Sequence, residues 1–337
     1  MRLRISMSTE KSNGKQPAFP ATPITALGSL EGNALYIKRD DLIPYSFGGN
    51  KARKALLFFE EIDAGDYDTV VTYGSTRSNH CRVVANMAAA RSMPCILISP
   101  EEEEESASPT FNSIYTELCG AERIQVPVDE VHDTIEDTLD KLRRAGKKPY
   151  FIPGGGHGNT GTRAYVQCYD EICRQEKAMN LHFDSIFFAS GTGTTQAGLV
   201  AGKLRHGDAR DIIGISIARK NPRGGNVVVD SVREYLPEYD PEVIRENVVF
   251  DDHYISGSYG GTTKEEKAAI KEAMIRWGIP LDTTYTGKAF FGMEQYIRDH
   301  GVTGRTILFL HTGGAPLFFD DLLREEKDRS GEMGETR

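Results

Sequence analysis

Residues 46–54 have the sequence Ser46-Phe47-Gly48-Gly49-Asn50-Lys51-Ala52-Arg53-Lys54, and the rest of the chain is organised around them. The two glycines permit positive φ and close approach of another molecule, and Asn50 is a natural N-cap for the helix predicted to follow. The helix dipole disfavours an ammonium ion at this end, so we expect a lowered pKa for Lys51 and an ε-amine able to form a Schiff base. A short glycine motif is a weak signal by itself, and the alternative is an ordinary solvated lysine.

The composition is that of a soluble globular protein, and the 337 residues predict two domains or one domain with an insertion. A net charge of −9, with no basic cluster, argues against nucleic acid as the main partner. No run is long enough to span a bilayer, and the N-terminus lacks the apolar core of a signal peptide. We therefore expect a cytoplasmic protein without a membrane partner.

The cysteines are odd in number and show no C-x-x-C or paired Cys/His spacing. This pattern is typical of reduced thiols and argues against a structural zinc site, so no metal is expected. The residues concerned are Cys81, Cys95, Cys119, Cys168 and Cys173.

Short apolar runs alternate with amphipathic stretches through most of the chain, which is typical of βα units with open parallel sheets. The predicted strands cover residues 34–39, 69–73, 94–99, 123–126, 149–152, 185–189, 212–217 and 306–310. The predicted helices cover residues 78–91, 110–118, 131–144, 163–174, 196–205, 263–276 and 288–299. Residues 1–19 are expected to form a mobile arm, and residues 219–226 an irregular surface loop of unknown purpose.

The segment Gly191-Thr192-Gly193-Thr194-Thr195 lies between a predicted strand and a predicted helix. Its free backbone N–H groups, the helix N-terminus and three threonine hydroxyls would converge on a phosphate. It lacks the lysine of a Walker loop and the third glycine of the dinucleotide fingerprint, so we interpret it as a monophosphate site. A turn that merely needs small residues is the alternative.

A second segment, Gly74-Ser75-Thr76-Arg77-Ser78-Asn79-His80, also joins a strand to a helix. Ser78 or Asn79 would cap that helix, and the same N–H, hydroxyl and amide donors are suited to a substrate carboxylate. His80 fits a buried structural role and an acid/base role equally well.

Two further candidates are Tyr285, just before a predicted helix, and Thr312, beside two glycines at a strand end. All four candidate segments fall at the carboxyl ends of strands, where open α/β sheets bind ligands. An imine-forming lysine, a monophosphate site, a carboxylate site and an aromatic hydroxyl together indicate pyridoxal 5′-phosphate acting on an amino acid.

With these motifs the sequence resembles the fold-type II pyridoxal-phosphate enzymes, specifically the family of 1-aminocyclopropane-1-carboxylate deaminase and D-cysteine desulfhydrase. The matching motifs are Lys38-Arg39-Asp40-Asp41-Leu42, residues 48–54, Ser78-Asn79, Tyr285-Thr286-Gly287-Lys288 and His311-Thr312-Gly313-Gly314. The resemblance implies two open, mostly parallel α/β domains of the tryptophan synthase β-like architecture. The large cofactor-binding domain would comprise residues 20–54 and 161–337, and the small inserted domain residues 55–160.

The resemblance also implies roles for single residues. Lys51 matches the lysine that carries the cofactor and later moves the α-proton, and Asn79 the asparagine beside the pyridoxal 3′-oxygen. Gly191, Thr192, Gly193, Thr194 and Thr195 match the phosphate loop. Tyr285 matches the catalytic tyrosine that packs at the ring, and Thr312 falls where a hydroxyl meets the pyridine nitrogen.

On the substrate side, the resemblance implies roles for Ser78, Asn79 and His80. His80 stands where the family more often has glutamine, and residues 154–158 are unusually rich in glycine, so the substrate's identity stays open. Thr286 stands where the cyclopropane deaminase branch has a glutamate. A hydroxyl from Thr286 or Thr312 would leave the pyridine nitrogen largely neutral, which favours the D-cysteine desulfhydrase branch.

The sequence is thus identified as a pyridoxal-phosphate lyase that would convert a small D-cysteine-like amino acid to pyruvate and ammonia by β-elimination. Three alternatives stay open: β-replacement on a serine-like or cysteine-like substrate, cyclopropane deamination, and cofactor binding without turnover. The family is often dimeric, so a homodimer is expected.

Overall fold

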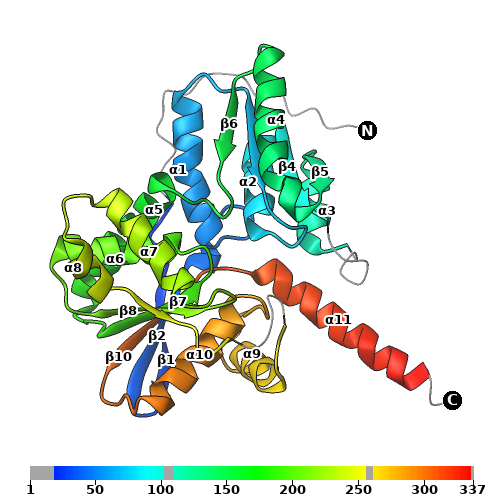
Figure 1. The fold of residues 1–337 in the computed structure, drawn as a ribbon. Coiled ribbons are helices and arrows are strands. Elements are labelled where there is room, and N and C mark those ends of the chain that lie inside the picture. Colours follow the sequence, from blue (N-terminus) through cyan, green and yellow to red (C-terminus); the bar gives the residue numbers. More distant parts are fainter. Residues whose placement is uncertain (1–18, 102–108, 256–260, 335–337) are drawn as a thin grey trace.

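The computed structural model describes residues 19–101, 109–255 and 261–334, which form two separate sheets (Figure 1). All but one residue of the expected N-terminal arm lie outside this part of the chain. The larger sheet has the strand order β1-β2-β10-β7-β8-β9, and only the β1–β2 pair is antiparallel. Its strands are β1 (Ile24–Leu30), β2 (Asn33–Arg39), β7 (Ser185–Ser190), β8 (Asp211–Ser216), β9 (Val249–Asp251) and β10 (Thr306–His311).

The smaller sheet has the order β5-β4-β3-β6, and all of its pairs are parallel. Its strands are β3 (Thr69–Tyr73), β4 (Cys95–Pro100), β5 (Glu122–Val126) and β6 (Pro149–Ile152). The predicted fold class, two open and mostly parallel α/β sheets, is therefore confirmed.

The helices are α1 (Asn50–Ala64), α2 (Asn79–Ala89), α3 (Phe111–Leu118), α4 (Val131–Arg144), α5 (Asn159–Met179), α6 (Thr194–His206), α7 (Arg223–Tyr235), α8 (Pro241–Glu246), α9 (Lys264–Trp277), α10 (Thr286–Asp299) and α11 (Ala315–Gly334). Two short 3₁₀ helices, η1 (Asp40–Leu42) and η3 (Val128–Glu130), precede α1 and α4.

The core of the larger sheet follows the two-residue period of its strands. On β7, Ile186 and Phe188 pack with α5, α6 and α7, whereas Phe187 and Ala189 pack with α9 and α10 on the other face. Because helices cover both faces, β7 is buried along its whole length and appears in the sequence as an apolar run.

The smaller sheet is covered in the same way. Val70 and Leu97 pack with α1 and α2, and Val71 and Ile98 pack with α4. The ends of β3 and β6 in this sheet, and of β7, β8 and β10 in the larger one, border a common cavity.

Two expectations about local structure are wrong. Residues 219–226 were expected to form a loop, but α7 begins at Arg223, so only the first residues are irregular. Asn50 is the first residue of α1 and does not cap it, because Gly49 occupies the N-cap position with φ 92°. The Asn50 side chain instead donates a hydrogen bond to Thr195 Oγ1 at 3.2 Å.

Candidate active site

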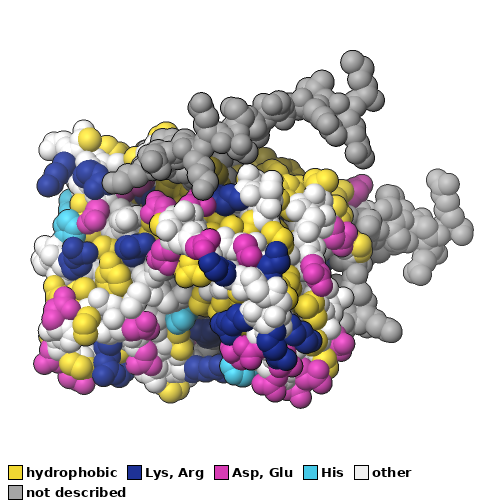
Figure 2. All heavy atoms as spheres, turned by 90° about the horizontal axis from the view of Figure 1, so that it is seen from above, with side chains coloured by type: hydrophobic (Ala, Val, Ile, Leu, Met, Phe, Trp, Pro, Cys, Tyr) yellow, Lys and Arg dark blue, Asp and Glu magenta, His cyan; other side chains and the backbone are white. Residues whose placement is uncertain are grey.

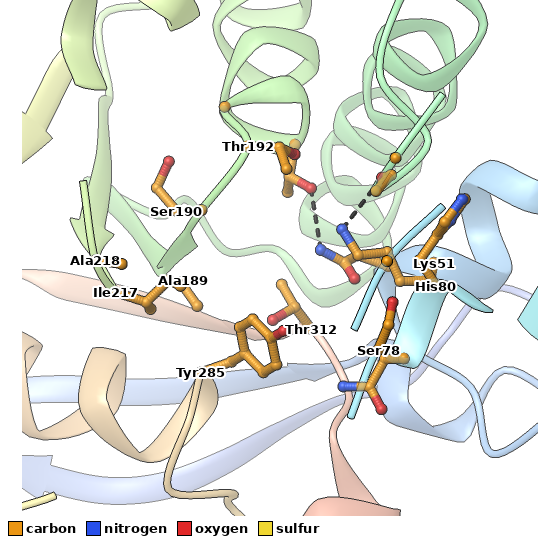
Figure 3. Close-up of a pocket in the computed structure, with 18 of the residues that line it drawn as sticks. Lys51, Ser78, His80, Ala189, Ser190, Thr192, Ile217, Ala218, Tyr285 and Thr312 are labelled. Atoms are coloured by element: carbon orange, nitrogen blue, oxygen red, sulfur yellow. Dashed lines mark hydrogen bonds between the residues drawn. The ribbon is translucent and has the colours of Figure 1, made fainter. Parts of the chain in front are cut away.

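A cavity of about 310 Å³ lies between the two sheets and is lined by residues from both (Figure 3). Figure 3 shows Lys51 and Ser78 on one side of this space and Tyr285, Ile217 and Ala218 on the other. Of the site residues that the sequence predicts, all except Thr194 and Thr286 line the cavity. The position at the carboxyl ends of parallel strands is the one where open α/β sheets bind ligands.

Lys51 lies in the first turn of α1, and its Nζ donates a hydrogen bond to the Gly155 carbonyl at 3.1 Å. Burial lowers the pKa of Lys51 to about 8. The predicted direction of this shift is found, although the cause is removal from water rather than the helix dipole that the sequence suggested. At pH 7 about a tenth of Lys51 is therefore an uncharged amine, far more than for a lysine of ordinary pKa.

The two glycines before Lys51 are required by close packing against neighbouring backbone. A Cβ at Gly48 would lie 2.2 Å from the Asp41 carbonyl oxygen, and a Cβ at Gly49 would lie 2.7 Å from that of Thr312. The Asn50 N–H donates to the same Thr312 carbonyl at 2.9 Å. The turn before Lys51 is thus held directly against the end of β10.

A buried network of ion pairs also holds the turn before Lys51 in place. Arg53 pairs with Asp40 at 2.6 Å and with Glu171 of α5 at 3.0 Å, and Lys38 of β2 also pairs with Glu171. Burial alone would raise the pKa of Asp40, but Arg53, together with Lys38 and Thr22, outweighs this effect and holds that pKa below its ordinary value. The network joins β2, η1, α1 and α5 beneath the cavity.

Lys54 lies one turn after Lys51, and sequence reasoning did not single it out. Its side chain is 1% exposed, and its Nζ has no hydrogen-bond partner within the described residues. Burial, together with the nearby Lys51, holds the pKa of Lys54 well below its ordinary value. A buried amine without a partner costs free energy unless a ligand, here an anion, satisfies it. The i, i+3 spacing from Lys51 was the available signal, because it places both side chains on one side of the helix.

The loop after β7 supplies the second element of an anion site. Gly193 takes φ 90° at the N-cap of α6, so the first N–H groups of that helix have no side-chain cap. The expectation that three threonine hydroxyls converge on one ligand is wrong for Thr194. Its Oγ1 lies 2.8 Å from His157 Nδ1, and Thr194 is outside the cavity wall.

The N-terminus of α2 presents hydrogen-bond donors to the cavity. Ser78 is the N-cap, and its Oγ accepts a hydrogen bond from the Cys81 N–H. The Asn79 Oδ1 accepts hydrogen bonds from Arg82 and from Asn112 Nδ2, which leaves the Asn79 NH₂ group as the donor available to the cavity. Backbone, hydroxyl and amide donors at a helix start are suited to a carboxylate.

His80 is a neutral residue of the cavity wall. Thr72 donates its hydroxyl hydrogen to the Ile152 carbonyl at 2.7 Å, so the contact of 2.9 Å between Thr72 Oγ1 and His80 Nε2 requires the histidine to donate. His80 Nδ1 is therefore the ring nitrogen able to accept. Burial, with Lys51 and Lys54 nearby, holds the pKa of His80 well below its ordinary value.

Tyr285 is held in place by the carboxylate of Asp282. Asp282 Oδ1 accepts from the N–H groups of Thr284 and Tyr285, and Oδ2 accepts from the N–H and hydroxyl of Thr286. Thr286 is fully buried and outside the cavity wall, so the expectation that its hydroxyl reaches the pyridine nitrogen is wrong. Thr312 does line the cavity.

Several cavity residues were not identified from the sequence, among them Tyr73, Ile217, Ala218 and Arg219. Tyr73 ends β3, and the other three directly follow β8. Their position at strand ends was the available signal, because every strand end of an open parallel sheet is a candidate ligand position.

Two kinds of feature are absent from the described part of the chain. No group of three or more His, Cys, Asp or Glu side chains there is placed to hold a metal ion. Likewise, none of the helices described is both long and apolar enough to cross a membrane. On the face shown in Figure 2, basic and acidic side chains are interspersed and do not form one basic surface.

Comparisons with known proteins concern the chain as a whole. A family model described as pyridoxal-phosphate dependent enzyme matches residues 15–313. D-cysteine desulfhydrases from Serratia proteamaculans and Yersinia enterocolitica are each 33% identical to this chain, and each alignment covers 89% of this chain and 93% of the relative.

Solved structures give the same result. The crystal structure of an ACC deaminase homologue superposes with a TM-score of 0.77 at 32% identity, covering 90% of this chain and 93% of that one. A threonine deaminase from T.th. superposes with a TM-score of 0.64 at 16% identity, covering 88% and 94% of the two chains, and this likeness concerns the fold alone.

Proposed function

The chain belongs to the family of pyridoxal-phosphate dependent enzymes, and from this premise we propose that it removes the β-substituent of a small D-cysteine-like amino acid to give pyruvate and ammonia. The observation that carries the proposal is the Lys51 amine, with a pKa lowered by burial to about 8, in a cavity that Ser78 and Asn79 also line. The relatives named for this activity support the choice of substrate class.

The residues of the cavity fit pyridoxal phosphate. Lys51 would bind its aldehyde carbon. The Lys54 amine, which has no hydrogen-bond partner among the described residues, would bind its phosphate together with the loop of residues 191–195. Tyr285 would pack at the ring, Asn79 would donate to the 3′-oxygen, and Thr312 would supply a hydroxyl at the pyridine nitrogen.

When bound, pyridoxal phosphate withdraws electrons from the α-carbon of an amino acid and so weakens the bonds around it. Lys51 would accept the α-proton, because its lowered pKa makes the uncharged amine available. The Gly155 carbonyl, which accepts from Lys51 Nζ, keeps this amine within the cavity. Ser78, Asn79 and the N-terminus of α2 would hold the substrate carboxylate and so orient the α-hydrogen toward Lys51.

A substrate screen tests this proposal. We expect the purified enzyme to release pyruvate from cysteine-like or serine-like amino acids, with little or no 2-oxobutanoate from 1-aminocyclopropane-1-carboxylate. A neutral hydroxyl at the pyridine nitrogen, here that of Thr312, would make the cofactor ring a weaker electron sink than a carboxylate would. In addition, 1-aminocyclopropane-1-carboxylate has no α-proton whose removal could start the opening of its cyclopropane ring. Comparable turnover of the cyclopropane substrate would contradict the argument. A new β-substituted amino acid, formed in place of pyruvate when a second nucleophile is added, would favour β-replacement.

Three broader features belong to the same proposal. The chain would divide into a large domain of residues 20–54 and 161–337 and a small domain of residues 55–160. It would act in the cytoplasm, which suits its free cysteines. It would form a homodimer through the α3–α11 face, defined here by the exposed apolar side chains Phe111, Ile114, Leu118, Phe319, Leu322 and Leu323.

A further inference from the structure

Arg219 lines the active-site cavity, and neither the proposed cofactor contacts nor the proposed carboxylate site uses it. It follows β8 by three residues, in the segment that also contributes Ile217 and Ala218 to the wall. The Ser216 hydroxyl donates to the Arg219 carbonyl at 2.6 Å and accepts from the Ala218 N–H at 3.3 Å. These bonds fix the backbone from which the guanidinium extends.

The guanidinium of Arg219 makes no hydrogen bond or ion pair with the described residues, and its Nη1 is buried. Burial, with Arg223 nearby, lowers the pKa of Arg219, yet an arginine keeps its charge at neutral pH. A cationic donor atom that is buried without a partner is costly, and the buried arginines near the cavity, such as Arg53 and Arg82, have hydrogen-bond partners. This feature is typical of a group that binds an anionic ligand.

Arg219 has polar neighbours on two sides of the cavity: His157, beside the loop of residues 191–195, and Tyr73, which leads to the proposed carboxylate site. Tyr73, at the end of β3, is close enough to interact electrostatically with Arg219, and the segment after Tyr73 leads to Ser78 and Asn79. Figure 3 shows Ile217 and Ala218 across the cavity from Ser78. A substrate whose carboxylate lies at Ser78 would therefore direct its side chain toward the wall that carries Arg219.

We propose that Arg219 binds a negatively charged group on the substrate's side chain, so that the enzyme prefers amino acids with an oxyanion on the β-carbon. This inference rests on the proposed function and narrows its substrate class. A β-sulfonate or a β-phosphate ester would satisfy both the guanidinium and the elimination chemistry.

The reaction balances for both groups. With a β-sulfonate, Lys51 takes the α-proton, the Cβ–S bond breaks, and its electron pair leaves with sulfur as sulfite. With a phosphate ester, the Cβ–O bond breaks and phosphate leaves. In both cases, water then releases pyruvate and ammonia. A β-carboxylate has no comparable leaving group, so aspartate should bind without being consumed.

The test compares the holoenzyme with its Arg219→Gln variant on anionic and neutral substrates. Both enantiomers of cysteate and O-phosphoserine are the anionic probes, and both enantiomers of cysteine and β-chloroalanine are the neutral ones. We expect Arg219→Gln to lower kcat/KM for at least one anionic probe by roughly ten- to hundredfold, as for a lost charge-assisted hydrogen bond, and for neutral probes by less than about threefold.

Two further variants serve as controls. Arg223→Gln removes the same charge from an exposed neighbour outside the cavity and should leave the preference unchanged. Arg219→Lys keeps the charge but loses the bidentate geometry, so it should restore part of the preference. An equal loss of kcat/KM on all substrates, with release of cofactor from Arg219→Gln, would overturn the proposal. It would indicate that Arg219 binds the cofactor phosphate instead. Unchanged discrimination in Arg219→Gln would also overturn it.

A binding measurement separates this inference from the proposed function. If no amino acid is eliminated, the proposed function fails, but aspartate should still raise the melting temperature of the wild-type holoenzyme and not that of Arg219→Gln. If neutral amino acids are eliminated and aspartate stabilises both proteins equally, the proposed function stands and the role of Arg219 is refuted.

Discussion

Lys51 and Lys54 lie one helical turn apart on α1, and each amine is buried in a different setting. Lys51 has a hydrogen-bond acceptor in Gly155, whereas Lys54 has no hydrogen-bond partner among the described residues. The glycines before Lys51 identified it in the sequence, because two glycines at a helix start indicate a close approach of backbone or ligand. The spacing from Lys51 did not by itself identify Lys54 as a site residue. Lys54 is buried because Gly156 and α5, which are distant in the sequence, pack against it.

Site residues with a local sequence signal could be predicted, and those whose setting depends on distant residues could not. Ser78 and Tyr285 were found because strand ends and helix starts are visible in a single sequence. The partners of Thr194 and Thr286 could not be predicted, because His157 belongs to a distant loop and the Asp282 turn has no periodic pattern. Arg219 was assigned to a loop without purpose because its lack of partners is visible only in three dimensions.

The lowered pKa of Lys51 gives a pH dependence that is measurable on the apoenzyme. Only the uncharged amine attacks the cofactor aldehyde, and a pKa of about 8 means that its fraction rises between pH 7 and pH 8.5 by roughly eightfold. We therefore expect the rate at which added pyridoxal phosphate becomes protein-bound, followed by absorbance, to rise over this range and then level off.

Two outcomes check this prediction. Lys51→Ala should stay folded, as judged by circular dichroism, and show no covalent uptake at any pH. A rate in the wild type that keeps rising to pH 10 would instead indicate an ordinary lysine pKa and contradict the role of burial.

At the scale of single elements, the bounds of helices and strands with a clear apolar period were predicted to within a few residues. The bounds of α4 and β6 were predicted without error. β1 was missed because it is an edge strand whose side chains, apart from Leu27, are only partly covered or exposed, so it shows no apolar alternation. The start of α7 was obscured by Pro222 and by two glycines that are poor helix formers. Tertiary contacts override local propensity in both places.

The turn before α10 is an element held by one carboxylate, and this gives a prediction for Asp282→Asn. The substitution replaces a buried acceptor of four hydrogen bonds by an amide that presents a donor to some of the same N–H groups. We expect a loss of about 1.5–3 kcal/mol in the free energy of unfolding, measured by urea denaturation, and a lower kcat because Tyr285 is no longer fixed.

Thr286→Val is the matched control for that turn. It removes one hydroxyl from Asp282 and should cost about 1 kcal/mol of stability, with the absorbance spectrum of the bound cofactor unchanged. A shifted spectrum in Thr286→Val would show that this hydroxyl acts on the pyridine ring after all, contrary to its position outside the cavity.

At the scale of the whole molecule, the alternation of strands and helices predicted two parallel sheets but not their strand order. β10 lies between β2 and β7, so strands from both ends of the chain are neighbours in one sheet. The Arg53 network joins three such segments, β2, α1 and α5, under the site. Such long-range pairings leave no local pattern, and the domain boundaries at residues 55 and 160 stay a prediction for the same reason.

The proposed homodimer also belongs to this scale. On α3, the exposed apolar residues Phe111, Ile114 and Leu118 follow helical spacing, and on α11 Phe319, Leu322 and Leu323 do the same. The two helices are linked where the Phe111 N–H donates to Asp320 of α11 at 2.9 Å. In Figure 1, α11 extends away from both sheets. Apolar stripes on two neighbouring helices that face water are typical of surfaces buried in an assembly.

We expect the double variant Ile114→Asp/Leu118→Lys to be a monomer in light scattering coupled to size-exclusion chromatography, while the wild type is a dimer. The reason is that a charge buried in an apolar interface costs more than the interface gains from a few side chains. Ile275→Asp is the control, because Ile275 is 86% exposed on α9 and lies outside the α3–α11 face. This variant should remain a dimer. A wild-type monomer, or a double variant that still dimerises, would show that this face is not the dimer interface.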